Sequence, residues 1–314
     1  RKTYIYNSQF TNLKASLSAG AIHIKELDEL LIESCNFINV TSTKNGGAAF
    51  IDTQGFLYNN TGITIINNTM FANCSSEFGG ACNLGSLFLH NFVINPFRAD
   101  AHIDFITLSK TIFSAVKMLD NIIDVNAFPN EVYENYQKNF RTIGLGFTGL
   151  GDTLAMMNLK YNTPSARAFT DSLVEFIAFN AYKASVELAK ERGSFPFLDR
   201  EKFVQSGYIL KHCKEQDSSW RDLKEDILKY GIRNAKILSV APTGTLSITF
   251  GNNCSSGLEP IFSLEYDRKV KVGGQTDDKI RIIKMRDYAY GLWCDMKDEP
   301  DNIVSKDVFV TALE

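Results

Sequence analysis

The sequence lacks several features that would place a chain at once in a functional class. Its six cysteines form no Cys-x-x-Cys pair, so neither a zinc site nor a small disulfide framework is expected. Its four histidines show no metal-ligand spacing. No apolar run approaches the roughly 18 residues that span a bilayer, and the first ten residues do not form a signal peptide. The net charge of −3 excludes binding to a nucleic-acid polymer through bulk charge.

What remains is the composition of a globular protein. Hydrophobic residues make up 44% of the chain and charged residues 22%, which argues against extensive disorder. A chain of 314 residues can form two ordinary domains or one large one. It begins without Met, so we expect an incomplete piece of a longer protein.

The first 81 residues repeat a Phe-x-Asn pattern three times, at Phe10, Phe37 and Phe71. Each copy is followed by a triplet of small residues, which are Ala19-Gly20-Ala21, Gly46-Gly47-Ala48 and Gly79-Gly80-Ala81. A period of about 30 residues predicts a solenoid, here a parallel β-helix-like segment in which phenylalanines stack in the core. The segment resembles the repeats of polymorphic outer-membrane and related surface β-helix proteins. That resemblance implies an alternative function, an extracellular adhesion or structural module.

From residue 82 the pattern changes to one of helices alternating with short apolar runs. Apolar residues at helical spacing predict a helix over about 104–123. Thr163-Pro164 predicts the start of a second helix, which Gly193 should end. Residues 235–240 predict a short buried strand, broken by Pro242-Thr243-Gly244. This mixed order predicts an α/β architecture.

The loop after that strand carries candidate substrate-binding residues. They are Ala241, Pro242, Thr243, Gly244, Thr245, Leu246 and Ser247. A strand that ends in a tight turn before hydroxyl residues at a helix start directs free N–H groups and hydroxyls to one point, which suits a phosphate. The hydroxyl of Thr245 or Ser247 could equally cap the helix. Local chemistry leaves both readings open.

Gly144-x-Gly146-x-x-Gly149 formally matches a dinucleotide-binding fingerprint. That fingerprint requires a hydrophobic strand directly before it and an acidic residue at a strand end about 20 residues on. Here the polar run 134–139 precedes the glycines, and Asp171 falls inside a predicted helix. We therefore predict that the glycines permit close backbone packing.

Several motifs follow one another in the order found in one enzyme family. They are Cys82-Asn83-Leu84-Gly85-Ser86-Leu87, Leu119–Asp124, Arg141–Asp152, 241–247, Ser255–Pro260 and Arg268-Lys269-Val270. Residues 82–314 resemble the carboxy-terminal part of the catalytic barrel of adenosylcobalamin-dependent (class II) ribonucleotide reductases. The resemblance implies a partial ten-stranded α/β barrel in the cytoplasm, whose reaction replaces the ribonucleotide 2′-OH by hydrogen.

The same resemblance assigns roles to residues and names partners. The loop 241–247 would hold the substrate diphosphate, and Cys82 would be one of two redox thiols. The implied cofactor is adenosylcobalamin. The implied partners are the ribonucleotide, a thioredoxin-like or dithiol reductant and the missing part of the barrel, without a membrane or a nucleic-acid polymer.

The sequence departs from the family where the radical cysteine should lie. The family has an Asn-x-Cys-x-Glu element about a dozen residues before the position of Cys82, with the glutamate as general base. Here Cys74 and Glu77 are the right residue types at the wrong spacing, and Cys74 also fits the third repeat. We expect domains at 1–81 and 82–314 and no ribonucleotide reduction by this chain alone. The join near residue 81 could be natural, a gene-model artefact or a designed chimera.

Overall fold

The computed structural model describes residues 82–128, 131–214, 218–272 and 279–313, together with the strands that lie between residues 2 and 76. The chain divides into two compact units. One consists of residues 1–81 with 127–137, and the other of residues 82–126 with 138–314.

The first unit is built from short parallel strands that pair one repeat with the next. Its sheets have the strand orders β1-β5-β9, β10-β6-β2, β11-β7-β3 and β4-β8. In the register of β2, β6 and β10, Phe10 pairs with Phe37 and Phe37 with Phe71. Stacking of equivalent strands is the arrangement that a repeat solenoid needs. The strands are β1 (Lys2–Tyr6), β2 (Gln9–Thr11), β3 (Lys14–Ala15), β4 (Ile22–Lys25), β5 (Glu29–Glu33), β6 (Asn36–Ile38), β7 (Thr41–Ser42), β8 (Ala49–Asp52), β9 (Ile63–Asn67), β10 (Met70–Ala72) and β11 (Ser75–Ser76).

The second unit contains a small parallel sheet. Strand β12 (Asn83–Phe88) pairs with β15 (Ile143–Thr148), and Leu145 forms a parallel bridge to Leu238. Within the described residues this sheet is open and no closed barrel forms. The unit therefore shows the expected mixture of helices and parallel strands, without the ten strands of a whole barrel.

The predicted strand at 235–240 is shorter than expected. The amides of Ile143 and Leu145 donate to consecutive carbonyls, those of Lys236 and Ile237, at 3.0 and 2.7 Å. A regular parallel ladder uses every second carbonyl, so this irregularity interrupts the pairing as a bulge does. The regular strand pairing of this segment is therefore limited to the parallel bridge between Leu238 and Leu145.

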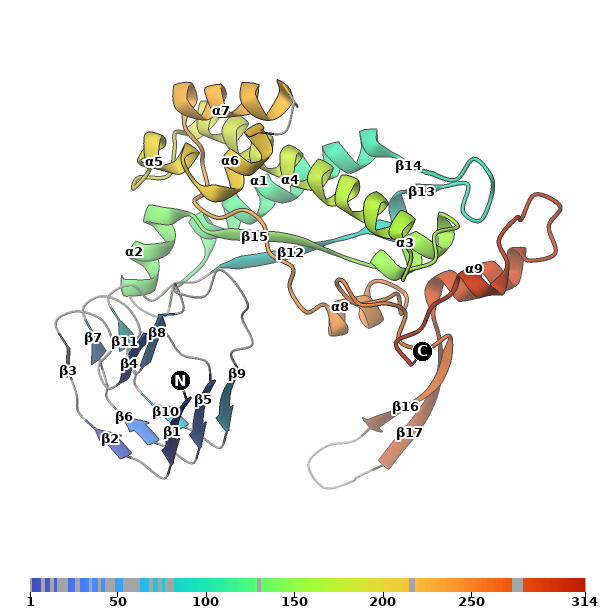
Figure 1. The fold of residues 1–314 in the computed structure, drawn as a ribbon, viewed down its shortest axis with the longest axis horizontal. Coiled ribbons are helices and arrows are strands. Elements are labelled where there is room, and N and C mark those ends of the chain that lie inside the picture. Colours follow the sequence, from blue (N-terminus) through green and yellow to red (C-terminus); the bar gives the residue numbers. More distant parts are fainter. Residues whose placement is uncertain are drawn as a thin grey trace. The chain divides into compact units, whose positions relative to one another are not determined.

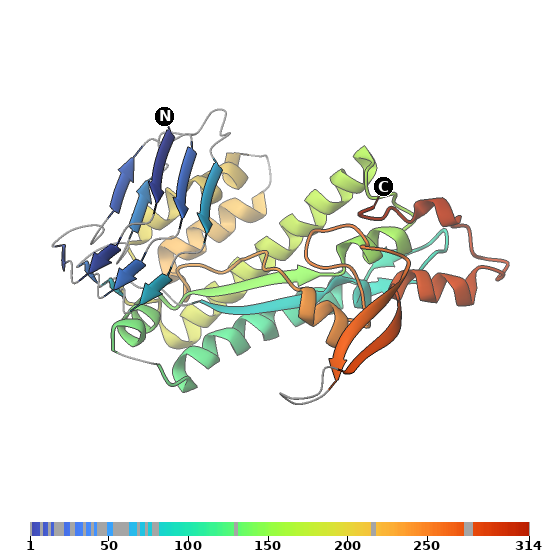
Figure 2. The ribbon, with the colours of Figure 1, turned by 90° about the horizontal axis from the view of Figure 1, so that it is seen from below.

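One long helix packs on one face of β12 and β15, and a second long helix packs against the first (Figures 1 and 2). Helix α1 (Phe105–Val125) begins after Asp104, whose side chain accepts from the amide of Thr107 at 2.9 Å. The predicted helix at 104–123 is thus confirmed. Helix α4 (Pro164–Arg192) has Thr163 as its N-cap and Gly193 at its end, as predicted.

The remaining elements complete the second unit around this core. They are η1 (Leu89–Phe92), β13 (Val93–Ile94), β14 (His102–Ile103), α2 (Glu131–Phe140, which spans both units), α3 (Leu150–Met156), α5 (Arg200–Val204), α6 (Gly207–Lys214), α7 (Ser218–Tyr230), α8 (Gly244–Thr249), β16 (Glu265–Val272), β17 (Lys279–Arg286), α9 (Tyr288–Met296) and η2 (Lys306–Val308). None of the described helices is long and apolar enough to cross a membrane.

Candidate functional site

The sheet of the second unit has one face covered by helix and one face that carries Cys82. The side-chain amide of Asn83 donates to the carbonyl of Leu119 in α1 at 3.3 Å, and a Cβ on Gly85 would lie 3.3 Å from the Leu119 side chain. Since side chains alternate along a strand, Cys82 and Leu84 belong to the opposite face. Leu84 is 55% exposed there.

Cys82 lies beside the strand that leads to the predicted phosphate loop. A Cβ on Gly144 would lie 3.2 Å from the Cys82 sulfur and 2.7 Å from the Ser239 Cβ, so these two side chains adjoin. Partial burial raises the pKa of the Cys82 thiol, and the opposing charge of Lys236 reduces that shift. Cys82 therefore carries its proton at neutral pH. It faces the loop side of the sheet but does not line the cavity described below.

The four described cysteines, Cys82, Cys213, Cys254 and Cys294, are all free thiols. Cys254 lies beside Phe88 at the far end of β12, since both are within 3 Å of the Cβ position of Gly251. The two ends of this strand are roughly 20 Å apart, whereas a disulfide joins Cα atoms about 4 to 7 Å apart. Cys254 is thus not a redox partner for Cys82. Cys74 and Glu77 lie outside the described residues.

The glycine motif has the packing role that the sequence indicated. Gly144 and Gly146 lie inside β15, and a Cβ on Gly146 would be 2.1 Å from the carbonyl oxygen of Ser239. Gly149 has a φ of 78°, which a residue without Cβ adopts at no steric cost. The first two glycines therefore lie inside β15 and let a neighbouring segment approach closely, whereas a dinucleotide fingerprint begins in the turn after a strand.

Two of the family-like motifs meet in a buried ion-pair network at the start of the sheet. The guanidinium of Arg141 donates to Asp120 Oδ1 and to both carboxylate oxygens of Asp124, each at 2.8 Å. Arg233 and Asn234 also donate to Asp120, at 3.3 and 2.9 Å. Asp120 is fully buried and Arg141 is 4% exposed. These residues hold α1 to the sheet and take no part in the cavity.

The predicted phosphate loop lies at the other end of the sheet. The Thr243 hydroxyl is buried, where it donates to Thr148 Oγ1 and accepts from the amide of Gly257, both at 2.8 Å. This hydroxyl fixes the loop and is not free to bind a ligand. The Ser247 hydroxyl lies 3.1 Å from that of Ser256 and donates to the carbonyl of Gly244.

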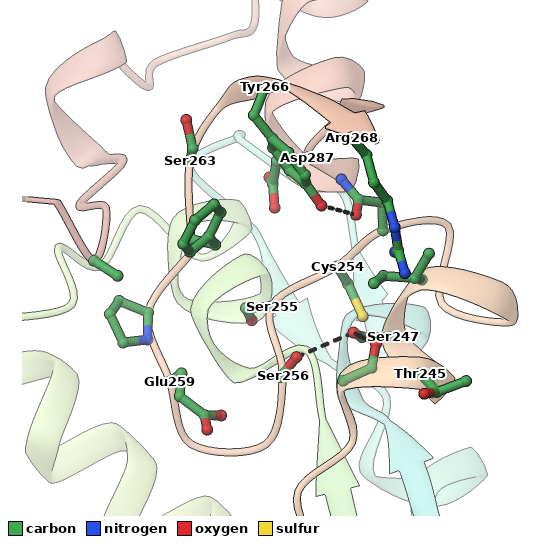
Figure 3. A pocket seen from close by; sticks show the side chains of 16 residues that line it. Thr245, Ser247, Cys254, Ser255, Ser256, Glu259, Ser263, Tyr266, Arg268 and Asp287 are labelled. Carbon is green, nitrogen blue, oxygen red and sulfur yellow. Dashed lines mark hydrogen bonds between the residues drawn. The ribbon is translucent and has the colours of Figure 1, made fainter. Parts of the chain in front are cut away.

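A cavity of about 450 Å³ opens beside this loop (Figure 3). Of the seven loop residues expected to bind phosphate, Gly244, Thr245 and Ser247 line the cavity. Ala241, Pro242, Thr243 and Leu246 do not. The lining is completed by Ile248, Asn253, Cys254, Ser255, Ser256, Glu259, Pro260, Phe262, Ser263, Tyr266, Arg268, Asp287 and Ala312.

A pair of buried carboxyl groups supports the floor of the cavity. Asp152 accepts from the amides of Ser255 and Ala289, at 2.7 and 3.0 Å. Burial raises the pKa of Asp152 to about 6. Burial and the nearby Asp152 raise the pKa of Asp287 well above its ordinary range. Burial likewise raises the pKa of Cys254 to about 12, so this thiol is not a nucleophile at neutral pH.

Several lining residues were not among the predicted site residues. Ser256 and Arg268 stand in motifs that the sequence did single out, so the signal was present without an assigned role. Asp287 precedes α9 as its N-cap, and it accepts from the amide of Tyr290 at 3.0 Å. That capping role was readable from the sequence, but its place in the cavity depends on contacts across the fold.

Comparison with known families bears on this geometry. The model of the ribonucleotide reductase barrel domain matches residues 68–294. The chain belongs to this family. The match to the reductase family begins before residue 82, inside the third repeat, and ends before the last residues of the chain. The recognition of a ribonucleotide reductase large-subunit segment is therefore confirmed.

Individual reductases are similar over most of this chain. It is 30% identical to the ribonucleoside-diphosphate reductase subunit alpha of Chlamydia muridarum over 287 residues, which cover 81% of this chain and 26% of that relative. It is 32% identical over 245 residues to the vitamin B12-dependent ribonucleoside-diphosphate reductase of Thermoplasma acidophilum, covering 74% of this chain and 28% of that relative. The large subunit from Variola virus is 33% identical over 196 residues, covering 61% and 24%. The chain spans about a quarter of the length of these relatives.

Proposed function

We propose that this chain contributes the phosphate-binding part of a ribonucleotide reductase active site, with a ribonucleoside diphosphate as ligand. The observation that carries the proposal is the cavity beside α8, which Thr245, Ser247 and Arg268 line (Figure 3). Its volume of about 450 Å³ lies within the range of small-molecule sites. The names of the Chlamydia and Thermoplasma relatives support a diphosphate as substrate.

Two threonines one turn apart on α8 provide a matched test. Thr245 lines the cavity, whereas Thr249 does not and its hydroxyl donates to the carbonyl of Thr245 at 2.7 Å. Thr245→Ala should weaken CDP binding by about 1 kcal/mol or somewhat more, because a donor to a charged acceptor is lost. Thr249→Ala should leave binding unchanged. Isothermal titration with CDP measures both, and no binding to the folded wild-type chain would refute the proposal.

We further propose Cys82 as a redox thiol whose partner is absent from the described part of the chain. Replacing the ribonucleotide 2′-OH by hydrogen consumes two electrons and two protons and releases water. Two thiols supply them when they form a disulfide. Cys82 is protonated and accessible, but none of the described cysteines lies beside it. The chain alone should therefore bind nucleotide without reducing it.

Turnover is tested with the purified chain, adenosylcobalamin, a dithiol and each ribonucleotide. We expect no deoxynucleotide above background, because substrate binding cannot replace a missing radical path. Product that disappears in Cys74→Ser would show that Cys74 serves as the radical cysteine despite its spacing. Product that persists in Cys74→Ser would point to another radical source and would equally overturn the expectation.

We propose class II, with adenosylcobalamin, on the family motifs and on the name of the Thermoplasma relative. The described residues do not form a site for that cofactor. The imidazole Nδ1 of His90 is buried without a hydrogen-bond partner among them, but it lies beneath Gly149, whose Cβ position is 2.4 Å away. No cluster of metal-ligating side chains occurs in the described ranges. We therefore derive no step through cobalamin.

For the first unit we propose a parallel β-helix-like repeat joined to the reductase segment near residue 81. The in-register pairing of β2, β6 and β10 supports it. A surface-repeat function for the whole chain is not favoured, since the reductase family covers residues 68–294. The reductase segment would act in the cytoplasm with a thioredoxin-like or dithiol reductant and the missing part of the barrel.

A further inference from the structure

The antiparallel hairpin of β16 and β17 borders the cavity and carries several basic residues. Arg268 in β16 pairs with Ile283 in β17, and its neighbour Lys269 pairs with Ile282. Successive residues of a strand face opposite sides, so the two cations belong to different faces of the hairpin. Arg268 lines the cavity and Lys269 does not. In Figure 3 the Arg268 side chain reaches from its strand toward α8.

Hydrogen bonds fix the cavity-facing side of the hairpin to the loop before it. The Tyr266 hydroxyl donates to Asn253 Oδ1 at 2.8 Å, and Asn253 Nδ2 donates to the carbonyl of Arg286 at 2.9 Å. Tyr266 lies two residues before Arg268 and therefore on the same side of β16. These bonds fix the part of the strand that carries Arg268 before any ligand arrives, so the backbone loses little conformational entropy on binding.

Arg268 differs from the other arginine at the base of this hairpin. Arg286 forms an ion pair with Glu265 at 2.8 Å. Arg268 makes no ion pair or hydrogen bond with any residue in the described ranges. Among the residues that line the cavity it is also the only basic one. The Thr245 hydroxyl is a neutral donor and the Ser247 hydroxyl already donates to the carbonyl of Gly244, so any full positive charge offered to a ligand comes from Arg268.

We propose that Arg268 determines specificity for the number of phosphate groups, by pairing with the terminal phosphate of a nucleoside diphosphate. A guanidinium binds two phosphate oxygens at once and keeps its charge at any working pH. The Thr245 hydroxyl would then hold one phosphate and Arg268 the other. A nucleoside monophosphate would leave one of the two groups without a partner. This assignment rests on the proposed function of the cavity.

The experiment compares CDP with CMP on four proteins by isothermal titration: the wild type, Arg268→Gln, Arg268→Lys and Lys269→Gln. Lys269→Gln removes the same charge from the adjacent position of the strand and is the matched control. We expect CDP to bind the wild type at least tenfold more tightly than CMP, which corresponds to about 1.4 kcal/mol. Arg268→Gln should bring the two affinities within about threefold, a residual difference of about 0.65 kcal/mol. Lys269→Gln should keep the full ratio.

The outcomes separate the two proposals. If the folded wild type binds neither nucleotide, the proposed function fails and this assignment with it. If Arg268→Gln still binds CDP with the wild-type ratio, only the assignment to Arg268 is overturned. Equal weakening by Arg268→Gln and Lys269→Gln would also overturn it, since the effect would then be one of general charge. Arg268→Lys should bind CDP more tightly than Arg268→Gln and less tightly than the wild type, because lysine has the positive charge but cannot bind two phosphate oxygens in the bidentate geometry of a guanidinium.

Discussion

An arginine lies near each end of the small sheet, and the two arginines differ in their surroundings. At the start of the strands Arg141 is buried and satisfied by Asp120 and Asp124. At the end of the strands Arg268 borders a cavity without a carboxylate partner in the described ranges. Both arginines stand in motifs shared with the reductase family, so a family motif alone does not distinguish a structural cation from a ligand-binding one. The difference between the two arginines lies in whether a carboxylate of the described residues pairs with the guanidinium.

Identical substitutions at the two arginines should show the largest contrast. Arg141→Ala should lower the free energy of unfolding by about 3 to 5 kcal/mol, because it removes a main partner of the buried Asp120 carboxylate. Arg268→Ala should change it by less than about 0.5 kcal/mol, since it breaks no contact of this kind. Urea unfolding followed by circular dichroism measures both.

A second variant separates the ion pair from the backbone. Arg141 has a φ of 50°, which Ala adopts with strain. Asp120→Ala removes the same pair without changing that residue, so a loss of the same order is expected from it. Equal stabilities of the Arg141 and Arg268 variants would refute the contrast between the two ends.

The glycines that bring the strands together should show an intermediate effect. Gly146→Ala places a methyl group 2.1 Å from the Ser239 carbonyl oxygen, and backbone must move to relieve it. We expect a loss of about 1 to 3 kcal/mol, the usual cost of overpacking. Gly244 has no atom within 4 Å of its Cβ position, so Gly244→Ala is the control and should be neutral or slightly stabilising. Matching losses would show that the close approach is not the cause.

Local sequence signals predicted the helices well. The spacing of apolar residues located α1, and Thr163-Pro164 with Gly193 delimited α4. These signals lie within one or two turns of the features that they determine. The sequence also predicted the turn and the helix start at 241–247, where the structure has α8; phosphate binding by this loop stays a prediction.

Contacts between distant residues could not be predicted. The Thr243 hydroxyl was predicted to bind phosphate, yet it donates a hydrogen bond to Thr148, 95 positions away in the sequence. Arg268 belongs to one of the family-like motifs, but whether its guanidinium has an ion-pair partner depends on where the carboxylates lie in the fold. A single sequence does not show which polar groups are already paired when the chain has folded.

The buried acids extend the comparison and give the smallest effect that we expect. Asp120 forms ion pairs with Arg141 and Arg233, whereas Asp152 accepts from amides and faces the carboxyl of Asp287. Burial raises the pKa of Asp152 from 3.8 to about 6. Between these values the folded state binds more protons than the unfolded state. The contribution of Asp152 to stability is therefore present at pH 4 and is lost as the pH rises through 6.

The test is the stability of Asp152→Asn relative to the wild type at several pH values between 4 and 7.5. Other titratable groups near Asp152 are Asp287, Cys254 and His90, and burial lowers the pKa of His90 to about 4 and so keeps it neutral over most of this range. Asn cannot accept at both oxygen positions, so the variant loses about 1 to 3 kcal/mol at acidic pH. The difference should shrink toward neutral pH, because Asn has no proton to lose and the wild type must then bury a charge. Asp222→Asn, at an exposed position, is the control and should track the wild type. A difference that stays constant from pH 4 to 7.5 would show that Asp152 is already ionised in the fold at pH 4, and it would contradict the expected loss of stability as the pH rises.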